Sequence, residues 1–182
     1  MVTASEWRAP AREPRAHARA ATPLGMVVLV RGPALRGGVE ALTEGWEEWR
    51  LSLDGRDLMT VHDLGAPGPP ARRRARRTVH GLLLPAVPGS GAAGELTLTA
   101  RRSLRAARRA VALSGPFGVL TFRRQRLEVV LLDSRGQPLA RLGAEGWRGT
   151  ALADPVVLGA VCPFHWAELA DLLPPPGSVR QE

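Results

Sequence analysis

Short apolar runs and short stretches of apolar and polar alternation recur along this chain, a pattern typical of β-strands. The clearest case is residues 118–142, where predicted strands at residues 119–123, 126–132 and 138–142 follow one another. The last two are separated by an Asp-Ser-Arg-Gly turn at residues 133–136. This spacing predicts an antiparallel meander.

Six further strands are predicted outside that region. An Asp-Gly pair at residues 54–55 is a strong hairpin signal between two of them, with at most a short helix before the first. Residues 103–113 fit two structures: a helix with Val111 on a face opposite the arginines, or a strand entering the turn at Gly115. The six strands are expected at residues 26–30, 48–53, 57–64, 79–84 and 95–101 and around Trp147.

One helix is predicted near the C-terminus, over residues 156–173. Asp154 is suited to be its N-cap, and Pro155 follows at the first helical position. The first half is apolar on nearly every side, which predicts burial, and Pro163 is expected to kink or restart the helix. We therefore expect a mainly β (α+β) fold, an antiparallel meander or barrel packed around a C-terminal hydrophobic helix.

A chain of 182 residues suits one domain. Residues 24–174 are expected to form a single globular β-rich domain, after a disordered Arg/Ala/Pro-rich leader at residues 1–23 and before a short tail at residues 175–182. Met26 is an alternative start to Met1. No stretch reaches the roughly 18 apolar residues of a membrane-spanning helix, and a single cysteine excludes an intramolecular disulfide. The expected location is the cytoplasm, with peripheral attachment to a membrane as an option.

The composition points to a GC-rich genome. Lys, Ile, Asn and Tyr are absent, whereas Arg, Ala, Gly and Pro are abundant, which matches the GC content of their codons. The net charge of +8 therefore records the genome in part. The missing residue types exclude a P-loop lysine, a Schiff base, an N-glycosylation site and a Cys-His-Asn triad.

The charges are nevertheless separated along the chain. Residues 72–148 hold 16 arginines against four acidic residues, whereas residues 40–63 hold seven acidic residues against two arginines. Guanidinium groups bind phosphate through two parallel hydrogen bonds, so the basic region is a candidate anion-binding surface. Solvated arginines without a partner are the alternative. The candidate anion-binding residues are Arg72, Arg73, Arg74, Arg76, Arg77, Arg101, Arg102, Arg105, Arg108 and Arg109.

Catalytic and cofactor motifs are weak. The G-x-G-x-x-G that ends at Gly94 leads into a strand pattern, so it offers no helix N-terminus to a dinucleotide. Cys162 and His165 make at most half of a zinc site. His62 beside Asp63 could serve as a base for Ser114 or Ser134, but neither serine lies in a G-x-S-x-G elbow. We predict no catalytic residue, no metal and no cofactor.

The hairpin sequence at residues 120–142, followed by the helix that begins at Asp154-Pro155, resembles the tubby C-terminal, scramblase and LURP-one-related barrels. The resemblance covers roughly residues 100–173. It implies a barrel with residues 156–161 threaded through its centre and a role at phospholipid headgroups.

Three functions follow, in order of preference. The first is a non-catalytic binding or accessory domain whose Arg-rich surface contacts an anionic partner such as phospholipid headgroups. The second is a nucleic-acid-associated protein that binds phosphates non-specifically, although five Trp, three Phe and no Tyr provide few stacking platforms. The third is a small enzyme with a His-centred pocket.

Overall fold

The fold is mainly β, as predicted. The computed structural model describes residues 16–33, 47–62, 79–83, 94–101 and 109–173. They form an 11-stranded antiparallel sheet in which each strand pairs with the strands before and after it in the sequence. The strands are β1 (Ala16–Thr22), β2 (Gly25–Pro33), β3 (Glu47–Leu53), β4 (Arg56–His62), β5 (Val79–Leu83), β6 (Gly94–Arg101), β7 (Ala110–Gly115), β8 (Gly118–Gln125), β9 (Glu128–Leu132), β10 (Pro138–Gly143) and β11 (Gly146–Arg148).

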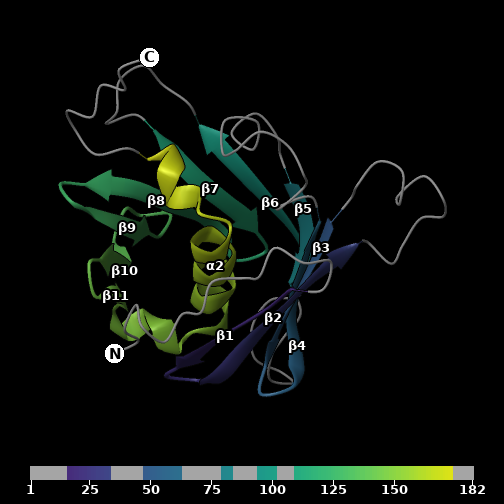
Figure 1. Ribbon diagram of the computed structural model, residues 1–182. Coiled ribbons are helices and arrows are strands. Elements are labelled where there is room, and N and C mark those ends of the chain that lie inside the picture. Colours follow the sequence, from purple (N-terminus) through teal and green to yellow (C-terminus); the bar gives the residue numbers. More distant parts are fainter. Residues whose placement is uncertain (1–15, 34–46, 63–78, 84–93, 102–108, 174–182) are drawn as a thin grey trace, which may run out of the picture.

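The sheet curls around one helix, α2 (Pro155–Trp166), which lies between the β1 to β5 side and the β8 to β11 side (Figure 1). The strand order has β1 and β11 at its two edges, so the meander describes the fold better than a closed barrel does. No helix among the described residues is long and apolar enough to cross a membrane.

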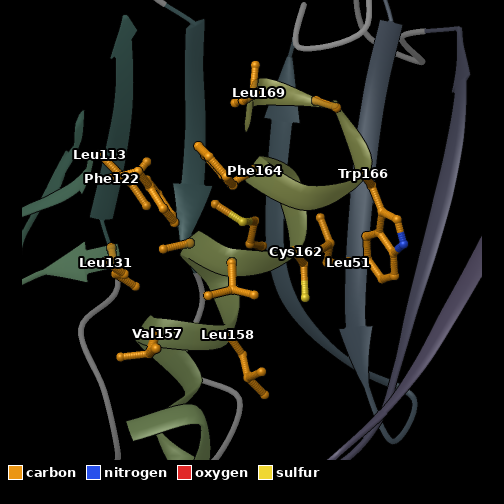
Figure 2. Close-up of a cluster of buried hydrophobic side chains, with 14 of the residues drawn as sticks. Leu51, Leu113, Phe122, Leu131, Val157, Leu158, Cys162, Phe164, Trp166 and Leu169 are labelled. Atoms are coloured by element: carbon orange, nitrogen blue, oxygen red, sulfur yellow. The ribbon is translucent and has the colours of Figure 1, made fainter. Parts of the chain in front are cut away.

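The inner face of the sheet and most of the surface of α2 form the core. Nine of the twelve α2 residues are buried, because strands face the helix on opposite sides. Figure 2 shows Phe164 directed towards Phe122 of β8, while Trp166 points the other way, towards the strand that carries Leu51. The apolar character that predicted a buried helix is therefore explained by the surrounding sheet.

The start of α2 was predicted correctly. The Asp154 Oδ1 atom accepts a hydrogen bond from the Val156 amide at 2.7 Å, and Pro155 occupies the first turn. Its end differs from the prediction, because α2 passes through Pro163 and stops at Trp166. Glu168 then adopts a left-handed conformation with φ of 56°, which separates α2 from the short 3-10 helix η5 (Leu169–Leu172).

The predicted leader boundary was wrong, because residues 16–22 form β1. This strand pairs with β2 along its full length, and its Ala18 and Ala20 side chains face the core while Arg19 is exposed. An Ala and Arg alternation carries little hydrophobic signal, which is why the strand was missed. The domain therefore begins by Ala16 rather than at residue 24.

For residues 103–113 the strand alternative is confirmed where the structure describes them, because Val111 lies in β7, which enters the turn after Gly115; residues 102–108 lie outside the described residues. One other prediction needs correction. The strand predicted at residues 126–132 begins two residues later, because Arg126 and Leu127 form a tight turn between β8 and β9. Arg126 has φ of 55° there, a left-handed conformation.

The meander gives the sheet two different ends. At the first, which we call the turn end, most connections are tight, including the Asp54–Gly55 turn predicted from its sequence. The second, which we call the loop end, receives three longer connections: residues 34–46, 63–78 and 102–109. The β8–β9 and β10–β11 turns and the first residue of β1 also lie at the loop end.

Candidate functional site

Most of the predicted anion-binding arginines lie outside the described residues. This holds for the five arginines of residues 72–77 and for Arg102, Arg105 and Arg108. The backbone places Arg101 as the last residue of β6, paired with Ala110, and Arg109 directly before β7. The two described candidates therefore lie beside each other, where β6 ends and β7 begins.

The strand pairing brings the two groups of arginines to one end of the sheet. β4 ends at His62 and β5 begins at Val79, and both positions lie at the loop end. Val79 pairs with Leu98 of β6, so Arg101 ends its strand at the same side. The connection that carries the arginines of residues 72–77 and the one that carries Arg102 to Arg109 thus join the sheet at neighbouring strands, β5 and β6, which lie about 5 Å apart.

The net positive charge of the chain belongs to segments that join the loop end. The described residues hold twelve arginines against eleven acidic residues, which is close to balance. The remaining residues hold thirteen arginines against six acidic residues. The connection at the turn end, residues 84–93, has no charged residue. The excess lies in residues 63–78 and 102–108 and, by one charge, in residues 1–15, whereas residues 34–46 hold one arginine against two acidic residues and residues 174–182 are balanced.

The described part of the loop end includes an open pocket of about 520 Å³. It lies beside the β8–β9 turn, and the walls are largely apolar, with Val129, Leu142 and Ala144 on the sheet side and Ala170 from η5. Arg124 of β8 supplies a cation to this pocket.

Arg124 is held in place by two backbone carbonyls. Its Nε group donates to the Leu173 carbonyl, and its Nη1 group donates to the Leu127 carbonyl at 3.1 Å. A guanidinium has five N–H groups, so three remain that bind nothing among the described residues. Arg124 is therefore both anchored and able to bind an anion.

The arginines on the outer face of β10 and β11 are engaged differently. Glu128 forms ion pairs with Arg148 and with Arg141, the latter at 3.4 Å. Val130, the strand partner of Arg141, is fully buried but is not part of the main core cluster. This group stabilises the outer face and is a poor candidate for anion binding.

The catalytic alternatives gain no support from the described geometry. Cys162 is fully buried, and burial raises the pKa of its thiol far above the usual value, which disfavours the thiolate that a nucleophile requires. Burial also lowers the pKa of His165. His62 ends β4 at the loop end, whereas Ser114 and Ser134 lie near the turn end. Asp63 lies outside the described residues, and no cluster of metal-binding side chains occurs in the described part of the chain.

The glycine motif has a packing explanation at its last position. Gly94 begins β6 with φ of 156°, and a Cβ atom there would lie 2.3 Å from Cγ of Pro116. Gly89 and Gly91 lie outside the described residues. A strand follows the motif, as predicted.

Sequence reasoning did not identify Arg124 and Leu127. Leu127 lies inside the strand predicted at residues 126–132, and Arg124 lies between that strand and the one predicted at residues 119–123. The tight turn at Arg126 and Leu127 was therefore assigned to a strand. The available signal was the polar sequence Arg-Gln-Arg that precedes Leu127, followed by Glu128, which places one apolar residue among charged ones.

Comparisons with protein-family models, with curated proteins and with solved structures found no match to this chain.

Proposed function

We propose that this protein is a non-catalytic binding domain that attaches through its loop end to an anionic surface, with phospholipid headgroups as the partner. The observation that supports this most is the strand order, since it anchors the connections carrying Arg72 to Arg77 and Arg102 to Arg109 at the same end of the sheet. Each arginine close to an anionic bilayer contributes about 1 kcal/mol to binding. The protein would act in the cytoplasm as a peripheral membrane protein.

The turn end has the opposite charge, which favours one orientation on a negative surface. Its described charged residues are five acidic residues against two arginines: Asp54, Asp57, Glu95, Asp133 and Asp154 against Arg56 and Arg135. A negative bilayer attracts the loop end and repels the turn end. The resemblance to tubby-like barrels, which implies a role at phospholipid headgroups, supports the same proposal.

The test is co-sedimentation of the purified chain with vesicles of phosphatidylcholine and phosphatidylserine across a salt titration. Binding that weakens with salt and is absent with phosphatidylcholine alone is the expected result. Duplex DNA is added as a competitor, because the second candidate function is non-specific binding to nucleic acid. Displacement of the protein from vesicles by DNA would favour that alternative.

Two charge-matched variants identify the surface involved. The first changes Arg72, Arg73, Arg76 and Arg77 to Gln, and each change is expected to weaken vesicle binding about fivefold. The second changes four exposed arginines that lie outside the loop-end connections to Gln: Arg19, Arg56, Arg123 and Arg135. Equal losses in both variants would mean that net charge alone acts, and the proposed surface would be wrong.

A further inference from the structure

The β8–β9 turn presents the most exposed of the large apolar side chains among the described residues. Four large hydrophobic side chains are exposed among the described residues, and Leu127 is the most exposed, at 83%. Met26 and Val119, at 40% and 42%, lie at the turn end. Leu127 instead lies at the tip of a tight turn at the loop end.

The surroundings of Leu127 combine positive charge with apolar surface. Arg126 precedes it in the turn and is exposed, and Arg124 lies on the pocket side with N–H groups that bind nothing among the described residues. The pocket beside Leu127 is mostly apolar. A leucine flanked by arginines suits the boundary between lipid headgroups and acyl chains, where the leucine contacts the chains and the guanidinium groups contact phosphates.

The turn is also fixed in shape. Arg126 holds a left-handed conformation with φ of 55°, which non-glycine residues rarely adopt. The Leu127 carbonyl accepts the hydrogen bond from Arg124, whose other bond is to the Leu173 carbonyl at the end of η5. A rigid tip keeps Leu127 extended without an ordering cost on binding.

We infer that the β8–β9 turn inserts Leu127 into the bilayer while Arg124 binds a lipid phosphate in the adjoining pocket. This inference rests on the proposed function and gives it an orientation and a specific contact. The occupant is an anionic phospholipid bilayer, on the grounds of charge complementarity and continuity with the basic connections at the same end of the sheet.

A fluorescent label tests the insertion. Cys162 is the single cysteine and is fully buried, so Leu127→Cys and the control Val119→Cys each give one reactive thiol in the native protein. Both replace exposed apolar side chains at opposite ends of β8. With an environment-sensitive label and phosphatidylserine-containing vesicles, we expect a several-fold rise in emission and protection from aqueous iodide at position 127, and no change at position 119.

The possible outcomes separate this inference from the proposed function. If the labelled proteins sediment with vesicles but position 127 stays accessible to iodide, the insertion is wrong and the proposed function stands. A response at position 119 as large as that at position 127 would also overturn the orientation. If the unmodified chain does not bind vesicles at low salt, both proposals fail.

Substitutions give a second measurement that needs no label. Leu127→Ser is expected to weaken vesicle binding about tenfold, the loss of one buried apolar side chain. Arg124→Gln is expected to weaken it about fivefold, whereas Arg123→Gln, at an exposed neighbouring position, should have a smaller effect. Thermal melts of all three variants check the fold. Equal effects of the two arginine substitutions in folded proteins would exclude the phosphate contact.

Discussion

Three aromatic side chains join the helix to the sheet. Phe122 of β8 stacks on Phe164 of α2 with ring centroids 4.0 Å apart and planes 10° apart. Trp147 of β11 meets both rings edge on, at 6.0 Å and 5.9 Å. Aromatic pairs at such distances contribute about 0.5–1.5 kcal/mol beyond their area burial. These three residues therefore connect α2 to two separate parts of the sheet.

Removing either stacked ring should be costly. We expect Phe122→Ala and Phe164→Ala each to lower the free energy of unfolding by about 3–5 kcal/mol, because each leaves a cavity in a fully buried site. In a double-mutant cycle by urea denaturation the two losses should fall short of additivity by about 1 kcal/mol. Additive losses would show that the stacked pair contributes no more than its area. Where the double variant does not fold, Leu in place of Ala preserves the test.

The buried thiol of Cys162 predicts that the free energy of unfolding depends on pH in the alkaline range. Burial raises the pKa of its thiol, so the folded protein retains a proton that the unfolded chain loses above about pH 8.5. The unfolded state then binds fewer protons, and the free energy of unfolding falls as pH rises, by about 1.4 kcal/mol per pH unit. The chain has no Lys and no Tyr, so no other side chain titrates between about pH 9 and pH 10.5.

The measurement is urea denaturation at several pH values within that interval. Cys162→Ala removes the thiol and should give a flat profile. A slope that persists in Cys162→Ala would assign the pH dependence to another group.

At the scale of elements, features marked by local chemistry were predictable. Asp54 and Gly55 both have positive φ, at 47° and 79°, as the hairpin turn predicted from their sequence requires. The side chain of Asp133 accepts hydrogen bonds from the Arg135 and Gln137 amides, which explains the predicted turn. The N-cap at Asp154 is equally local. Each of these depends on residues within four positions of one another.

Features that depend on distant neighbours were not predictable. β1 is a strand because β2 pairs with it and because its small alanines fit against the core, not because its own sequence is apolar. The pocket at Arg124 requires η5, which lies 40 or more residues away in the sequence. That the basic connections share one end follows from the strand order alone.

Truncation tests how much β1 contributes to stability. A chain that starts at Met26 lacks β1, so β2 becomes the edge strand and pairs with β3 alone. We expect it to melt at a lower temperature, because the buried Ala18 and Ala20 are lost, and to self-associate in size-exclusion chromatography, because β2 is a longer and more apolar edge strand than β1. The control starts at residue 15, keeps β1 and should behave like the full chain. A monomeric Met26 chain with an unchanged melting temperature would show that β1 adds nothing to stability.

At the scale of the whole molecule, the sheet and core carry little net charge, whereas the excess of arginines lies in connections between strands. The described residues, which form the sheet and core, are close to electrical balance, and most of the positive excess lies in connections at the loop end of the sheet. An antiparallel meander produces this division directly, since alternate connections return to the same end. Genome composition can supply arginines, but it does not determine at which end of a sheet they are anchored.

This division predicts where a bound bilayer contacts the protein. Hydrogen exchange with vesicles containing phosphatidylserine should slow amides at Arg126, at Leu127 and in residues 63–78 and 102–108, because the negative surface covers the loop end. The amides of the Asp54–Gly55 turn and of residues 133–136 should exchange as in the free protein, since these acidic turns lie at the opposite end. Phosphatidylcholine vesicles serve as the control and should change neither end. Protection at the acidic turns would mean that the protein binds in another orientation, and the charge separation would not guide attachment.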